Sequence, residues 1–344
     1  MTDLTSEEKS MVSMKEIAAA CGVSVATVSK ALSDHHDIGE KTKQQVRETA
    51  DRLGYLPNLS ARYLKTNRSY NIGVLFEDAA QSGLTHDFFS GVLENLKITA
   101  ESRGYDITFL NTTSTDMSYV ERAQYRGFDG VAIACSDFSD PKVQELLGSS
   151  VRVVTVDYIA DNRTAVVSDN IDGMTQLMNY ILTQGHRRIA YIHGDEGRVT
   201  RQRLASYYRC MEEHGESVRE EYVQPALYRN RELAFEKTEE LLFMKEPPTC
   251  ILYPDDVAAF GGMNAIRARG LRVPEDISVA GYDGIRALQY SEPALTTIRQ
   301  DMQALGRLAA ESLISEIERP MMTAPVIHTV RSTLLEGKTV KKLK

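Results

Sequence analysis

The sequence predicts a small all-α domain followed by a larger α/β region with two sheet-forming halves. Two short helices joined by a glycine-containing turn occupy residues 14–32, an arrangement typical of a helix-turn-helix. Beyond Tyr70, apolar strand-like runs alternate with amphipathic helical segments, which indicates parallel sheets covered by helices. A polar bend at residues 160–164 divides this alternation into two runs. We therefore expect two sheet domains with a cleft between them.

Length and composition favour a soluble protein of several domains. A chain of 344 residues is too long for one compact core. No apolar run approaches the roughly 18 residues of a membrane span, and the polar, acidic start lacks the features of a secretion signal. The four cysteines are far apart and form no CxxC pair. We expect reduced thiols in a cytoplasmic protein, with no disulfide framework, no metal site and no membrane partner.

Charge is distributed unevenly along the chain. Residues 1–68 carry 10 basic and 9 acidic side chains, whereas the remainder carries 30 basic and 39 acidic ones. The overall net charge of −8 therefore resides in the longer part of the chain. A locally neutral-to-basic end beside an acidic body is expected if only that end contacts phosphate.

Local capping residues define the first three helices. Ser13 and Glu16 can form a capping box at the first helix, and Gly22 can adopt the positive φ of a tight turn. Ser24 can then cap the second helix, which would enter the DNA major groove. A third helix is predicted over residues 40–53, ending at Gly54. An ordinary αα-hairpin within a core is the alternative interpretation.

A short segment after Pro57 is predicted to form a helix that needs support. Residues 59–65 allow at most two helical turns, which are not stable alone in water. Arg62, Lys65 and Arg68 can contact phosphates, and Leu64 is an apolar group with no obvious core to enter. An apolar side chain between cations is what minor-groove binders insert into a base step.

Three strings in this region carry a family resemblance: KEIAAACGVSVATVSKAL, RLGYLPNLSARYLK and IGEKT. They resemble the DNA-binding head of the LacI/GalR family of bacterial transcription regulators. The resemblance implies that base contacts fall on Val25, Ala26 and Lys30, and that Leu64 is the hinge leucine inserted at the operator centre. The complete set of expected DNA-binding residues is Ser24, Val25, Ala26, Thr27, Ser29, Lys30, Asn58, Ala61, Arg62, Leu64 and Lys65.

Further strings extend the resemblance: SDNIDGM, LTQGHRRIAYIHGD, GYDG and LTTIRQDMQALGRLAAESL. They are similar to the family's α/β periplasmic-binding-protein-like type I sensor of two subdomains, each a parallel sheet with helices on both faces. The resemblance implies a head at 1–57, a hinge helix and linker at 58–69, and an effector-binding and dimerisation domain at 70–344. The first subdomain would comprise about 70–160 plus 295–328, and the second about 161–294 plus 329–344. The chain would cross between them near Ala160, Leu295 and Thr329.

The resemblance also implies an effector pocket. Arg203 falls where the family pairs an arginine with effector hydroxyls or carboxylates, although it could be a surface arginine. Asp283 would accept sugar hydroxyls, Asp255 replaces a common asparagine, and the neighbouring Asp256 is expected to cap a helix. The full set of expected effector residues is Asp87, Phe88, Phe89, Asp137, Asp157, Arg203, Asp255 and Asp283. Either phenylalanine could instead belong to the core.

The sequence contains no GxSxG, P-loop, HExxH or dinucleotide fingerprint, so we expect neither an enzyme nor a cofactor. The resemblance implies a repressor of carbohydrate-utilisation genes that binds a pseudo-palindromic double-stranded operator under the control of a small effector, most simply a sugar. A homodimer is expected because the tail at residues 336–344 is short and has no heptads. An activator, or a response to a nucleobase or a phosphorylated co-regulator protein, stays open.

Overall fold

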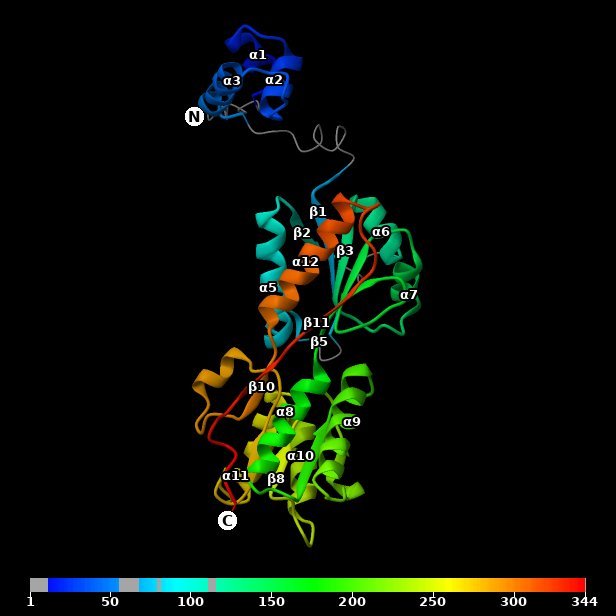
Figure 1. Cartoon of the computed structure of the whole chain (residues 1–344), viewed down its shortest axis with the longest axis vertical. Helices are drawn as coiled ribbons and strands as arrows, with labels where there is room; N and C mark the ends of the chain where they lie inside the picture. The colour runs from blue at the N-terminus through cyan, green and yellow to red at the C-terminus, as the bar shows by residue number, and fades with distance from the viewer. Residues whose placement is uncertain (1–11, 56–67, 79–81, 111–115, 344) are drawn as a thin grey trace, which may run out of the picture. The chain divides into compact units, whose positions relative to one another are not determined.

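The computed structural model describes residues 12–55, 68–78, 82–110 and 116–343. The chain divides into two compact units, Met1–Ser69 and Tyr70–Lys344. Helices and strands of both units are labelled in Figure 1. Among the described residues, no helix is both long enough and apolar enough to cross a bilayer.

The first unit contains three helices around a small core. They are α1 (Met14–Cys21), α2 (Val25–Leu32) and α3 (Glu40–Leu53). Gly22 ends α1 with φ 67°, and the Ser24 hydroxyl accepts the Thr27 N–H at 3.0 Å, so both local predictions are confirmed. At α1 the Glu16 carboxylate accepts the Ser13 N–H at 2.6 Å. The core residues are Ile17, Ala18, Val28, Ala31, Val46 and Ala50.

The second unit has two lobes, of which the N-lobe contains a six-stranded parallel sheet of order β11-β5-β4-β3-β1-β2. The strands are β1 (Asn71–Phe76), β2 (Asp106–Phe109), β3 (Gly130–Cys135), β4 (Val153–Val156), β5 (Thr164–Ser168) and β11 (Ile327–Val330). Helices α5 (Asp87–Ser102) and α12 (Met302–Glu318) pack on one face of the sheet, and α6 (Tyr119–Arg126) and α7 (Pro141–Gly148) on the other.

Helices α5 and α12 lie side by side, although some 200 residues separate them in the sequence (Figure 1). Their close approach depends on Gly306, where an added Cβ would lie 2.2 Å from the Val92 carbonyl oxygen. Leu305, Ala309 and Leu313 of α12 are buried in the same core as Leu96 of α5. A segment from the last eighth of the chain therefore completes the core of the N-lobe.

The C-lobe contains a four-stranded parallel sheet of order β7-β6-β8-β9. The strands are β6 (Ile189–His193), β7 (Val223–Pro225), β8 (Cys250–Leu252) and β9 (Ser278–Ala280). Helices α8 (Asn170–Thr183) and α9 (Arg198–Glu213) pack in one core, and α10 (Arg231–Leu242) and α11 (Asp256–Ala268) in the other. Single turns of 3-10 helix lie at η1 (Gly83–Thr85), η2 (Glu220–Tyr222) and η3 (Arg286–Tyr290).

The chain passes between the lobes at three places. The first lies between β5 and α8, and the second between β10 (Thr297–Arg299) and α12. The third lies between β11 and β12 (Thr333–Leu335), which pairs antiparallel with β10. The crossing expected near Ala160 therefore falls after Ser168, because β5 is a buried strand of the N-lobe sheet. Only residues 157–163 join β4 to β5, too few for the helix that usually links parallel strands.

Candidate functional site

Helix α2 presents one face away from the core of the first unit. Val28 and Ala31 are buried, whereas Val25 and Ala26 at its beginning are exposed, Val25 to 41%. Lys30 lies on the same exposed side, and the capping Ser24 is exposed as well. Thr27 and Ser29 are half-buried. The residues expected to meet bases are thus accessible, as a helix that enters the major groove requires.

Lys30 already has an ionic partner in this unit. Its Nζ lies 2.5 Å from Asp37 Oδ2, and Asp37 Oδ1 lies 2.7 Å from His35 Nδ1. The hydrogen bond from Lys30 holds the pKa of Asp37 at about 2. A contact between Lys30 and DNA would therefore compete with its ion pair to Asp37. Sequence reasoning missed this competition, because it depends on the loop after α2 folding back onto the helix.

Five of the expected DNA-binding residues lie outside the described residues: Asn58, Ala61, Arg62, Leu64 and Lys65. The minor-groove wedge formed by Leu64 therefore stays a prediction.

In the second unit, a cavity of about 540 Å³ lies between the two lobes. Its polar residues follow the carboxyl ends of parallel strands, where ligands bind in α/β folds. Asp157 follows β4 of the N-lobe, and Asp195, Asp255 and Asp283 follow β6, β8 and β9 of the C-lobe. Both sheets thus direct their strand ends into one site. Among the described residues, no group of three or more potential ligands is arranged to hold a metal ion.

The structure brings six of the eight expected effector residues to this cavity: Phe88, Phe89, Asp157, Arg203, Asp255 and Asp283. Phe88 also belongs to the N-lobe core, so the core interpretation holds for it in part. Asp87 does not line the cavity but forms an ion pair at its edge. Asp137 lies elsewhere and is exposed, because its carboxylate accepts the Ser139 N–H at 2.8 Å and turns the chain away after β3.

Arg203 is only 3% exposed, so it is not a surface arginine. Its Nε donates to Asn170 Oδ1 and its Nη1 to the Pro254 carbonyl, both at 2.9 Å. Its Cζ lies 3.5 Å from the ring centroid of Tyr282, a cation–π contact. Nη2 makes no hydrogen bond within the described residues. The guanidinium is therefore held rigidly with one nitrogen left for a ligand at the cavity wall.

Asp283 is another expected effector residue that lines the cavity. Its Oδ1 accepts at 2.7 Å from Nε2 of Gln300, which lies in the second crossing between the lobes. Burial raises the pKa of Asp283 to about 7, although the positive charge of Arg203 opposes the shift. Near neutral pH this carboxyl can therefore either donate or accept a hydrogen bond.

Asp255 lines the cavity as expected, but it also has the capping role that the sequence suggested for Asp256. Asp255 caps α11, with Oδ1 accepting the Ala258 N–H at 2.8 Å and Oδ2 accepting the Arg229 N–H at 2.6 Å. Asp256 is fully buried and accepts from the Thr297 hydroxyl at 2.6 Å. The expectation that Asp256 caps the helix was wrong, because α11 begins at Asp256 itself, one residue earlier than a cap at that position requires.

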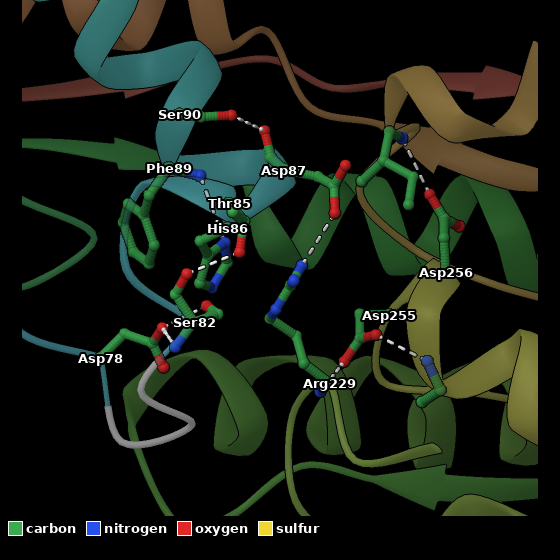
Figure 2. A network of polar contacts seen from close by, with 12 residues as sticks. Asp78, Ser82, Thr85, His86, Asp87, Phe89, Ser90, Arg229, Asp255 and Asp256 are labelled. Atoms are coloured by element: carbon green, nitrogen blue, oxygen red, sulfur yellow. Dashed lines mark hydrogen bonds and ion pairs between the residues drawn. The ribbon is translucent and has the colours of Figure 1, made fainter.

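Sequence reasoning missed several cavity residues, notably His86, Tyr228, Arg229 and Gln300. Figure 2 shows Arg229 between Asp87 of the N-lobe and Asp255 of the C-lobe. Tyr228 and Arg229 follow β7, a strand of only three residues that no periodicity reveals. Recognition of that strand would have predicted residues at its carboxyl end as cavity residues.

A helix-turn-helix head joined to a two-lobed α/β unit with an inter-lobe cavity defines a DNA-binding regulator with a small-molecule sensor. Residues 13–58 match the model of bacterial regulatory proteins of the lacI family, and residues 178–340 match that of periplasmic binding protein-like domains. The chain is 32% identical over 321 residues to the probable HTH-type transcriptional repressor ExuR of Bacillus subtilis (strain 168), covering 92% of this chain and 95% of that protein. It is 29% identical over 341 residues to the HTH-type transcriptional repressor PurR of Vibrio campbellii (97% and 100% covered).

Solved structures share the fold. The lac repressor dimer bound to operator and the anti-inducer ONPF matches with a TM-score of 0.79 and 24% identity, covering 96% of this chain and 100% of that one. The complex of the transcriptional regulator CelR with cellobiose matches with a TM-score of 0.70 and 24% identity (95% and 99% covered). This chain belongs to the lacI family of bacterial regulatory proteins. It is a DNA-binding transcriptional regulator and not an enzyme, as the sequence predicted.

Proposed function

We propose that this chain is a homodimeric repressor of carbohydrate-utilisation genes. It binds a pseudo-palindromic operator, and a sugar bound in the inter-lobe cavity changes its affinity for that operator. The observation that carries the proposal is the cavity itself, in which Arg203 of α9 and Asp283, which follows β9, line a common space. The name of the Bacillus subtilis relative and the cellobiose in the CelR complex support it. Such a repressor acts where the chromosome is, in the cytoplasm.

The chemistry of the cavity suits a polyol. Two buried atoms of cavity residues make no hydrogen bond within the described residues, the donor Arg229 Nε and the acceptor Gln300 Oε1. A sugar hydroxyl both donates and accepts, so a few hydroxyls can satisfy both kinds of group. The rings of Phe88, Phe89 and Tyr228 offer apolar surface to a pyranose face. The volume of about 540 Å³ falls in the range of small-ligand sites.

The mechanism follows from two lobes that can close on a ligand. Closure of the cleft in each subunit would shift the N-lobes of a dimer and thereby the spacing of the two hinge segments. A coupling free energy of about 1–3 kcal/mol would change operator affinity roughly 5- to 150-fold. Two-fold symmetry of the dimer would be matched by two similar half-sites in the operator.

Two titrations of the full chain test this function. Fluorescence anisotropy with duplexes tiled across the DNA upstream of its own gene would identify the operator. Calorimetry against D-glucose, D-ribose, cellobiose, hypoxanthine and adenine would then identify the effector class. We expect one of the sugars to bind and to change operator affinity at least about five-fold. If only a nucleobase binds, the effector is a nucleobase and the sugar proposal is wrong. If the chain binds none of the duplexes, the proposed function is overturned.

A further inference from the structure

One ion pair connects the two lobes beside the cavity. Arg229 Nη1 lies 3.2 Å from Asp87 Oδ2, and Figure 2 shows the two side chains reaching toward one another. Among the ion pairs between described residues, it is the one that joins the N-lobe to the C-lobe. It joins segments that belong to none of the three covalent crossings, so its loss leaves the lobes connected but can change how readily the cleft opens.

Each partner is fixed to its own lobe. Asp87 is the first residue of α5, where the helix dipole favours a negative charge. The Arg229 N–H donates to Asp255, which is 1% exposed and caps α11 of the C-lobe. His86, beside Asp87, does not compete for the carboxylate, because burial and the charge of Arg229 lower its pKa to about 4 and leave the ring neutral. The ion pair therefore connects the N-terminus of α5 in the N-lobe, through Arg229 and Asp255, with the N-terminus of α11 in the C-lobe.

A contribution to the stability of the C-lobe does not explain why an arginine occupies position 229. Arg229 adopts φ 58°, a left-handed conformation that side chains rarely occupy, and its buried Nε makes no hydrogen bond within the described residues. Both features cost free energy. Strain and an unpaired donor at the edge of a ligand cavity are typical of a residue retained for function.

We propose that Arg229 and Asp87 form a latch that sets the balance between the closed and open cleft. The proposal deepens the proposed function, since it names the contact through which closure would be controlled. Cys135 provides a built-in reporter, because it is half-buried and lines the cavity between the lobes. Its rate of modification by N-ethylmaleimide, followed by peptide mass spectrometry, measures opening in the full chain without DNA or effector.

The experiment compares Asp87→Asn, Arg229→Gln and the double variant with the unmodified chain. Because loss of either partner opens the latch, we expect both single variants to raise the Cys135 rate about five-fold. The double variant should react no faster than either single variant, since all three lack the same contact. A purely electrostatic influence on the thiol would instead move the two rates in opposite directions, because one variant removes a negative charge and the other a positive charge.

Matched controls distinguish opening of the cleft from a general loss of stability of the lobes. Arg103→Gln breaks an ion pair of 3.0 Å within the N-lobe, between Arg103 and Glu318, and should leave the Cys135 rate unchanged. Cys250, fully buried in the C-lobe, should stay unreactive in every variant. Unchanged or opposite Cys135 rates in the two single variants would overturn the latch. Because no DNA or sugar is present, that outcome would leave the proposed function standing.

Discussion

Arg203 lies against Tyr282, with the guanidinium carbon 3.5 Å from the ring centroid, and the same guanidinium donates to Asn170 and to the Pro254 carbonyl. This stacked and forked geometry cannot be reproduced by a lysine, whose ammonium is a compact point charge. The contact joins the beginning of α8, the end of β8 and the end of β9 around one cation. It therefore couples the structure of the C-lobe to the chemistry of the cavity.

The first prediction concerns Arg203→Lys. It should weaken binding of the effector by at least about ten-fold and lower the free energy of unfolding by about 2 kcal/mol, because buried acceptors lose their donors. Calorimetry and urea unfolding measure the two effects. Arg209→Lys, half-exposed on the same helix, is the control and should change neither quantity appreciably. Retention of full effector affinity by the lysine variant would remove Arg203 from the binding site.

The second prediction concerns pH. Burial raises the pKa of Asp283 to about 7 in the folded chain, above the roughly 3.9 of an unfolded aspartate. Between pH 4 and 7 the folded state therefore binds more protons than the unfolded state, and the free energy of unfolding falls as pH rises through this window. The pKa values of Asp157, Asp255 and Asp256 are raised by burial as well, so Asp283→Asn should flatten the slope without abolishing it. Urea midpoints of the unmodified chain and of the Asp283→Asn variant at pH 5.0, 6.0 and 7.5 test this. An equal dependence of the midpoint on pH in the two proteins would contradict it.

The third prediction tests the packing of α5 on α12. Gly306→Ala would place a methyl group 2.2 Å from the Val92 carbonyl oxygen, so the helices must separate. We expect a loss of about 2 kcal/mol in the free energy of unfolding, despite the better helix propensity of alanine. Gly148→Ala at the end of α7 meets no atom within 4 Å and should be neutral or slightly stabilising. Equal urea midpoints for the two variants would show that the Gly306 contact is not tight.

The fourth prediction concerns Leu64, which lies outside the described residues. Leu64→Ala should weaken binding to the specific operator at least about ten-fold, because the apolar wedge that opens a base step is lost. Binding to a scrambled duplex depends on phosphate contacts and should keep its affinity and its salt dependence. Anisotropy titrations on both duplexes at several salt concentrations make the comparison. An equal loss on both would show that Leu64 is not a wedge.

Local chemistry determined what the sequence could predict. The turn at Gly22 and the cap at Ser24 each depend on neighbours within four residues, and both were predicted correctly. Strands β5 and β7 were not predicted, because β5 is a five-residue segment without alternation and β7 has only three residues, two of which are glutamine and proline. Arg229 was missed together with β7.

The wrong assignment of the α11 cap to Asp256 has another cause. The boundary of α11 decides which carboxylate is the cap, and sequence patterns place helix ends only to within one or two residues. Two adjacent aspartates before an apolar helix cannot be told apart by pattern alone. Long-range contacts decide their roles, since the Thr297 hydroxyl of β10 donates to Asp256.

The position of α12 and β11 in the N-lobe has a consequence for biosynthesis. Strands β1 to β5 leave the ribosome first, yet the apolar face against which Leu305, Ala309 and Leu313 pack lacks its second helix until after residue 318 is made. The C-lobe sheet, complete by residue 280, can fold while the earlier lobe still exposes that face. Nascent chains are therefore most prone to aggregate during this interval, when chaperones that cover apolar surface have the greatest effect on yield.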